Sequence, residues 1–135
     1  MPRPTHSLAD NAILVIGAQR SGTTWLGKIF DSHPDVLYRH EPDQNKPPPD
    51  PARIRQEVEA LIHERRPRTA GKRPFFTKGY QSAAGHVARE AIWAAIELAS
   101  RVPVLRDLVR DASIPDFADI DAQTRLRPVL KSIDW

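Results

Sequence analysis

The chain has 135 residues, a formal net charge of +3 and no cysteine, with 40% hydrophobic and 27% charged residues. This length corresponds to one ordinary domain. The lack of cysteine excludes disulfides, thiolate zinc sites and cysteine nucleophiles. No apolar run approaches the roughly 18 residues that a membrane span needs, and the polar, proline-bearing start is unlike a signal peptide. We therefore expect a small cytoplasmic domain with a lean core.

The basic excess lies in one stretch of the chain. Residues 53–78 carry eight basic and three acidic residues, whereas residues 1–52 carry five and six, and residues 79–135 carry seven and eight. One interpretation is a solvated helix end and loop; the other is a collar that attracts an anionic ligand or acceptor. The stretch has no nucleic-acid-binding motif, so we expect no nucleic-acid partner.

The first half of the chain predicts a strand, a glycine loop, a helix and a second strand. Residues 1–11 are expected to form a disordered lead. The apolar run over 12–16 is typical of a strand buried on both faces. The remaining elements are a turn-rich loop over 17–24, a helix over 25–32, a short strand over 36–38 and a proline-rich loop over 41–51.

The second half predicts three helical segments and a last strand. Asp50 is expected to cap a helix that begins at Pro51 and ends near residue 66. The strongest helix signal carries an apolar stripe of Val87, Ala91, Ala94, Ala95 and Leu98. The predicted elements are a loop over 67–81 with a short extended piece at 75–77, a helix over 82–101, a helical turn or two over 103–110, a loop over 111–127 and a strand from 128. This order favours an α/β fold with a parallel sheet.

The loop after the first strand has the frame of a phosphate-binding loop. Gly17-Ala-Gln-Arg-Ser-Gly-Thr-Thr24 fits GxxxxGK[ST] with Thr23 in place of lysine. The glycines allow a tight turn, the backbone N–H groups form a concavity for an anion, and the following helix adds its N-terminal donors. Arg20 supplies a positive fork that suits phosphate or sulfate. The plain alternative is a glycine-rich turn without a ligand.

The missing lysine argues against an ordinary ATPase or kinase, in which that lysine reaches the β- and γ-phosphates. Two interpretations of a loop without this lysine stay open. One is an atypical P-loop nucleotide-binding protein, which Mg-ATP binding would favour. The other is a non-catalytic anion-binding remnant that keeps the loop without the chemistry.

The run from Gly17 to Leu26 resembles the 5′-phosphosulfate-binding loop of sulfotransferases that use 3′-phosphoadenosine 5′-phosphosulfate (PAPS). The continuation to His40-Glu41-Pro42 resembles the bacterial and carbohydrate-type branch of that family. The resemblance implies a P-loop-like three-layer α/β/α domain with a central parallel sheet. It also implies transfer of a sulfuryl group from PAPS, the co-substrate, to a hydroxyl or amine acceptor, without a metal.

The resemblance also assigns roles to residues. Arg20 would stabilise charge on the bridging oxygen of the donor. Glu41 is the first candidate for the general base, and His40 is the second, because an imidazole titrates near pH 6.5; either could instead cap a turn. The residues expected to hold the 5′-phosphosulfate are Arg20, Ser21, Gly22, Thr23, Thr24 and Trp25.

The last strand resembles a family strand that reads Lys-Thr-His in cytosolic members, where the histidine is the base. Ile133 stands at that position here, which strengthens the case for Glu41. Lys131 matches the lysine and is expected to assist the leaving group; the alternative is a surface lysine on a strand.

The family binds the donor's 3′-phosphate with an arginine after the third strand and a later serine. The sequence ends at Trp135 before any such element. We therefore expect residues 12–135 to be the truncated N-terminal part of a sulfotransferase domain, inactive alone. The acceptor is left open among small molecules, carbohydrates and lipids, as is the oligomeric state. No metal-ligand cluster is visible, and His33, His63 and His86 are expected at helix ends or on the surface.

Overall fold

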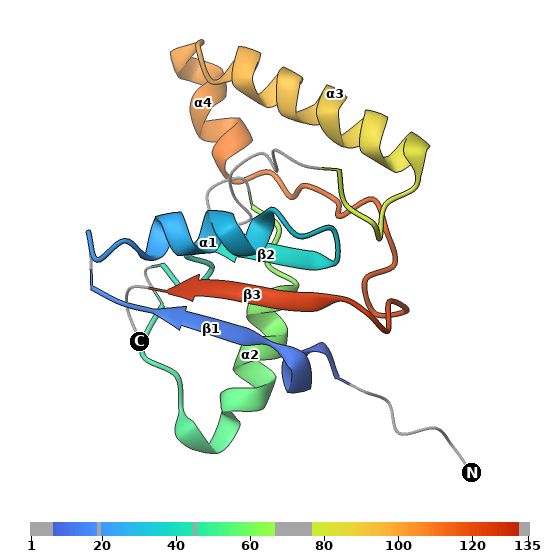
Figure 1. Ribbon diagram of the computed structural model, residues 1–135. Helices are drawn as coiled ribbons and strands as arrows, with labels where there is room; N and C mark the ends of the chain where they lie inside the picture. The colour runs from blue at the N-terminus through green and yellow to red at the C-terminus, as the bar shows by residue number, and fades with distance from the viewer. Residues whose placement is uncertain (1–6, 19, 45, 67–76, 133–135) are drawn as a thin grey trace.

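Three parallel strands form a sheet in the part of the chain that the structure describes. The computed structural model describes residues 7–18, 20–44, 46–66 and 77–132. Strands β1 (Ile13–Ile16), β2 (Val36–His40) and β3 (Arg127–Ser132) are ordered β1-β3-β2, so the last strand of the chain lies between the first two (Figure 1). The predicted α/β fold with a parallel sheet is confirmed.

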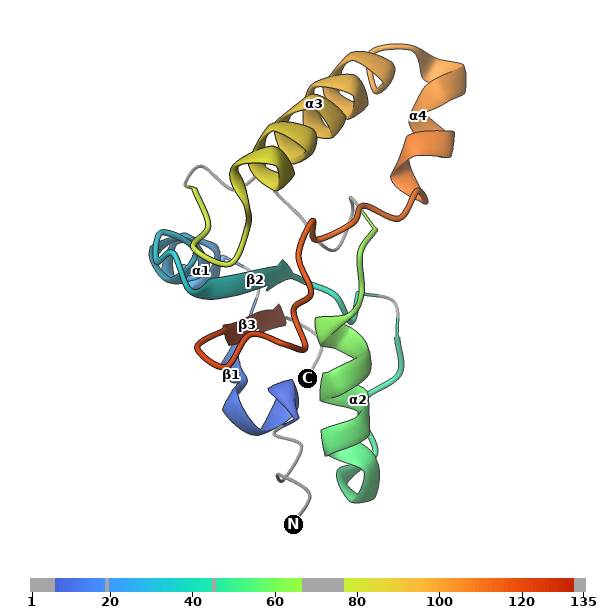
Figure 2. The ribbon, with the colours of Figure 1, turned by 90° about the vertical axis from the view of Figure 1, so that its right-hand side faces the viewer.

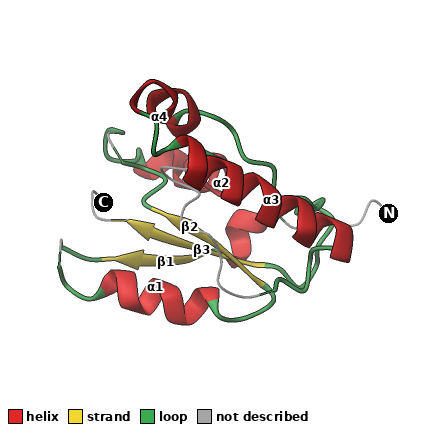
Figure 3. Cartoon of the chain, turned by 90° about the horizontal axis from the view of Figure 1, so that it is seen from above, coloured by secondary structure: helices red, strands yellow, loops and turns green. Residues whose placement is uncertain are grey.

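The main helices follow the predicted order along the chain. Helix α1 lies on one side of the sheet (Figure 3) and α2 on the other (Figure 2). The pair α3 and α4 lies beyond the β2 edge (Figure 1). Their bounds are α1 (Thr23–Asp31), α2 (Ile54–Ile62), α3 (Ala83–Ala99) and α4 (Pro103–Arg110). None of the helices in the described residues has the length and apolarity that crossing a membrane requires.

Side-chain caps fix where two of the helical segments begin. The Asp50 carboxylate accepts from the Ala52 N–H at 3.0 Å, and Pro51 opens the 3₁₀ turn η2 (Pro51–Arg53) that leads into α2. The predicted start is confirmed, although α2 ends at Ile62 rather than near residue 66. The Ser82 hydroxyl accepts from the Gly85 N–H at 3.0 Å and caps α3. This is where the sequence predicts that the helix begins.

Each face of the sheet has its own apolar core. Because side chains alternate along a strand, Val129 of β3 faces α1, while Leu130 faces α2. The α1 side buries Val15, Val36, Tyr38 and Val129, with Phe30 packed against them. The α2 side buries Leu8, Leu37, Val58, Leu61, Ile62, Ile120, Leu126 and Leu130.

Two expectations about buried surfaces are wrong. In β1 only Val15 is buried, while Ile13, Leu14 and Ile16 are exposed. The reason is that β1 is an edge of the three-stranded sheet. The expected apolar stripe of α3 is exposed as well; the buried residues of that helix are Gly85, Arg89 and Trp93, because α3 packs through another side.

The expected disordered lead is too long. Residues Leu8–Asn11 form the 3₁₀ helix η1, and Leu8 is buried in the core against α2. The predicted loop over 67–76, the extended piece at Phe75-Phe76 and the position of Ile133 lie outside the described residues.

Charged side chains are buried behind β2. The Arg39 guanidinium donates to the two carboxylate oxygens of Asp116, at 2.7 and 2.9 Å, and to the backbone oxygen of Ile62 at 2.7 Å. The Lys78 ammonium donates to the Asp31 carboxylate at 2.6 Å. Burial lowers the pKa of Lys78, and the charge of Asp31 opposes that shift. These contacts fasten the loops around residues 78 and 116 to α1 and β2.

Ile62→Ala should lower the free energy of unfolding by about 2–5 kcal/mol, because Ile62 is 0% exposed within the α2-side core. The same change at Ile54 of α2, which is 36% exposed, should cost about 1 kcal/mol or less. Urea unfolding followed by circular dichroism measures both. Equal losses would contradict the burial described for α2.

Candidate functional site

The loop between β1 and α1 turns tightly around its own side chains. A Cβ at Gly17 would lie 2.6 Å from the Thr23 methyl carbon and 2.7 Å from the Ser21 oxygen, so only glycine fits there. Arg20 and Gly22 both have positive φ, at 63° and 85°. No side chain caps α1, and the first N–H groups of a helix lack partners within it. The loop therefore directs backbone donors and the positive end of α1 toward one place.

A pocket of about 380 Å³ opens at that place. This volume suits a small ligand. Its described lining residues are Arg20, Gly22, Thr23, Thr24, Trp25, Lys28 and Lys131. Five of the six residues expected to hold the donor thus meet at one pocket, and Ser21 lies in the same loop outside this lining. Three lining side chains are cationic and none is a carboxylate, so the pocket attracts anions.

Lys131 of β3 joins this pocket to the candidate base. Its side chain is 3% exposed, and its ammonium forms an ion pair with the Glu41 carboxylate. The Glu41 N–H donates to the Lys131 backbone oxygen at 2.7 Å. The alternative of a surface lysine is therefore wrong, since Lys131 is buried between the loop and Glu41.

The second candidate base stands beside the first. His40 Nε2 lies 3.6 Å from Glu41 Oε1, and its Nδ1 lies 3.0 Å from the Tyr38 hydroxyl. Burial raises the pKa of Tyr38, and the charges of Asp31 and Glu41 raise it further. The raised pKa keeps the Tyr38 hydroxyl protonated even in alkaline solution, so the hydroxyl stays available for its contact with the imidazole of His40.

The turn after β2 is bound to the end of β3 at a second point. The Ser132 hydroxyl donates to one carboxylate oxygen of Asp43, while the buried Oδ1 of Asp43 has no hydrogen-bond partner among the described residues. Asp43 also lines a pocket of about 430 Å³ whose walls include Lys46, Pro47 and Pro48. Glu41 itself has a φ of 51°, a left-handed conformation that is unusual outside glycine.

The basic stretch is partly neutralised by acidic partners. Arg65 Nε lies 3.1 Å from an Asp116 oxygen, and Arg66 donates to both Glu64 oxygens at 2.9 and 2.8 Å. Burial acts to raise the pKa of Glu64, but the hydrogen bonds and charge of Arg66 outweigh it and lower that pKa to about 2. Arg68, Lys72 and Arg73 lie outside the described residues, so the collar stays a prediction.

The model of the sulfotransferase family matches residues 12–131. This chain belongs to the sulfotransferase family. No curated protein and no solved structure matches it. Membership indicates a transferase that moves sulfuryl groups. The match extends far beyond the loop and includes β2, β3 and the helices between them.

Two residues of the candidate site do not stand out in the sequence. Lys28 lines the pocket. It lies four residues after Thr24, about one helical turn away on the same side of α1. The position of Lys28 therefore follows from the position at which the helix starts. Asp43 follows Glu41 by two residues, but its buried contact with Ser132 joins segments 89 positions apart. No local pattern announces such a contact.

A double-mutant cycle with Lys131→Met and Glu41→Gln should give a coupling free energy within about 0.5–3 kcal/mol, because the ion pair is largely buried. The exposed pair of Arg55 and Asp10 is the control and should couple by less than about 1 kcal/mol. Urea unfolding of the single and double variants measures both cycles. Coupling no larger than that of the control pair would mean that Lys131 does not hold Glu41.

Proposed function

We propose that this chain binds the 5′-phosphosulfate of PAPS in the pocket at the start of α1 and transfers the sulfuryl group to a hydroxyl or amine acceptor. The observation that carries the proposal is the meeting of the β1–α1 loop, Lys131 and Glu41 at one end of the sheet. Ligands of open parallel sheets bind outside the carboxyl ends of the strands. We further propose a P-loop-like three-layer arrangement, supported by helices on both faces of the sheet.

The pocket residues fit the charged end of such a donor. PAPS carries a phosphosulfate anhydride, whose cleavage releases a phosphate anion. Arg20, Lys28 and Lys131 supply positive charge around the pocket. Thr23 and Thr24 supply hydroxyl groups and the free N–H groups at the start of α1, an arrangement suited to anionic oxygen. Such preorganised donors stabilise the charge that develops as the sulfur–oxygen bond of the donor breaks.

Glu41 is the proposed general base. As a carboxylate it would accept the proton of the acceptor hydroxyl or amine while the acceptor forms its new bond to sulfur. Lys131 and Arg20 would stabilise the departing phosphate oxygen. No metal enters this scheme, since the cationic side chains supply the charge.

The acceptor is proposed to approach along the proline-rich segment. A pocket is lined by Asp43, Pro47 and Pro48. The first of these residues follows Glu41 by two positions. The buried Oδ1 of Asp43 has no hydrogen-bond partner in the part of the chain that the structure describes. It suits a hydroxyl or ammonium donor of a bound molecule, because a buried acceptor without a partner is costly. Small-molecule, carbohydrate and lipid acceptors share the hydroxyl that this chemistry needs.

Arg20→Ala should weaken binding of PAP, the desulfonated product, by about ten- to hundredfold, the equivalent of one or two hydrogen bonds to a charged group. Arg101→Ala, an exposed change in the turn between α3 and α4, is the control and should bind PAP normally. Isothermal titration calorimetry of the 135-residue chain measures both. Binding of Mg-ATP in preference to PAP would favour a nucleotide-binding protein, and no binding of either would favour an anion-binding remnant.

Glu41→Gln should lower the turnover rate by a factor of about 10²–10⁴, the usual contribution of a general base, and should leave PAP binding unchanged. The assay follows PAP release in a form of the protein that turns over PAPS, at saturating donor. His40→Gln is the comparison and should lose much less. If Glu41→Gln turns over normally while His40→Gln does not, the base is His40.

A further inference from the structure

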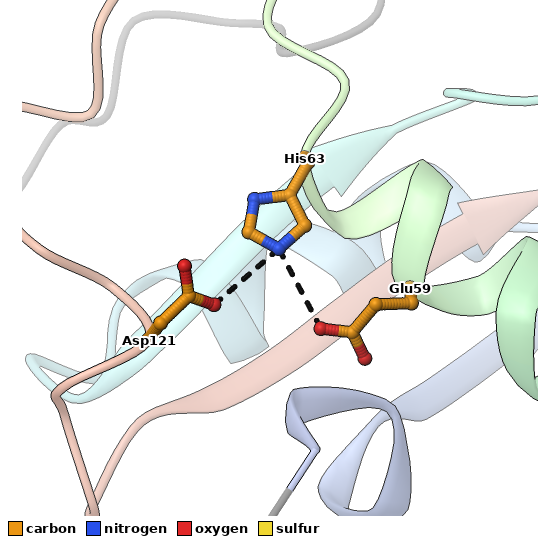
Figure 4. A group of neighbouring side chains, drawn as sticks. All are labelled: Glu59, His63 and Asp121. Carbon is orange, nitrogen blue, oxygen red and sulfur yellow. Dashed lines mark ion pairs between the residues drawn. The ribbon is translucent and has the colours of Figure 1, made fainter.

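We propose that Glu59, His63 and Asp121 form a binding site for a divalent transition-metal ion such as Zn²⁺, apart from the donor pocket. Glu59 and His63 come from α2 and its C-terminal end, and Asp121 comes from the segment that leads to β3 (Figure 4). One ligand atom of each residue lies within 4.8 Å of the others.

The distances suit one ion between the three groups. His63 Nε2 lies 3.5 Å from Glu59 Oε1 and 3.4 Å from Asp121 Oδ1. In a tetrahedral zinc site with ligand bonds of about 2.0–2.1 Å, ligand atoms are separated by about 3.3–3.4 Å. The two carboxylate oxygens lie within 4.8 Å of each other, and Asp121 is exposed enough to turn, with 64% of its side chain accessible.

The backbone around each ligand is held by the core. Ile62 and Ile120, the neighbours of His63 and Asp121, are both buried in the α2-side core. The other oxygen of Glu59 accepts from the Ser7 hydroxyl and from the Ala9 N–H, the latter at 3.0 Å. These hydrogen bonds orient the carboxylate and leave Oε1 directed at His63, as outer contacts do in metal sites.

The donor set indicates the class of ion. An imidazole with two carboxylates suits Zn²⁺ and its neighbours among the transition metals, whereas Mg²⁺ and Ca²⁺ prefer oxygen alone. A pocket of about 540 Å³ lined by Ser7, Arg55, Glu59 and His63 among others gives room for a water molecule as a further ligand. The charge of Arg55 in this pocket is offset by Asp10, 2.7 Å away.

The geometry also has a simpler explanation, in which a protonated His63 forms two ion pairs. The two explanations differ in their response to metal and acid. Zinc binds a ring nitrogen that carries no proton, so protons compete with zinc and the affinity for zinc should fall as the pH is lowered. If the residues form ion pairs alone, these pairs should instead strengthen in acid, and added zinc should have no effect.

Zinc titration of the 135-residue chain by calorimetry should show one ion per chain, and zinc should raise the melting temperature. Asp121→Asn should weaken binding at least about tenfold, since even outer contacts of metal sites are worth ten- to hundredfold. Asp119→Asn removes the same charge from an exposed residue two positions away and should bind zinc normally. Cobalt(II) bound to the wild type should give the visible absorption of a four-coordinate site.

Three results would overturn the proposal. The first is that zinc leaves the calorimetric signal and the melting temperature unchanged at pH 7.5. The second is an equal loss of affinity in the Asp121 and Asp119 variants, which would indicate attraction by general charge. The third is zinc binding that survives His63→Gln. Circular dichroism of each variant separates loss of the site from loss of the fold. None of these readouts depends on sulfuryl transfer, so the metal site and the proposed function can fail independently.

Discussion

The insertion of β3 between β1 and β2 is the constraint on which the rest of the structure depends. In register, Lys131 stands beside Val15 on one side and His40 on the other, and the first two strands meet only through it. The β1–α1 loop and the turn after β2 therefore reach the same edge of the sheet because residues 127–132 lie between them. The candidate site is local in sequence at its loop, but it is completed by a strand about a hundred residues later.

The buried charged residues next to β2 help to hold β3 in its place between β1 and β2. Arg39 binds Asp116, Gln81 donates to the Asp116 backbone oxygen at 2.8 Å, and the Ile114 N–H donates to the Arg65 oxygen at 2.8 Å. All three contacts fix the segment that delivers β3. Removing one partner of a buried ion pair leaves an uncompensated charge, so an alternative path for this segment is costly. The charges thus favour one route of the chain into the sheet.

The sequence was informative where the signals were local. The glycine loop, the caps at Asp50 and Ser82 and the helical periodicity predicted most elements to within a few residues. The family resemblance named six of the residues that line the pocket, Lys131 among them. The apolar residues of β1 and α3 led to wrong predictions of burial, because burial depends on which elements pack against each strand or helix. Glu59 and His63 have a visible helical spacing, but Asp121 joins them only through the fold of the segment before β3.

Alternation along β3 divides the end of the sheet into two sides. Lys131 faces the pocket at α1, and Ser132 on the other face of the strand binds Asp43. The turn from Glu41 to Asp43 is therefore held from both faces of β3. That double attachment explains why Glu41 keeps a left-handed backbone, a strain that its surroundings must hold. Under the proposed function, an anionic donor in the pocket competes with Glu41 for Lys131. Donor binding would then release the carboxylate to take a proton, which would couple the proposed base to the presence of the sulfuryl group.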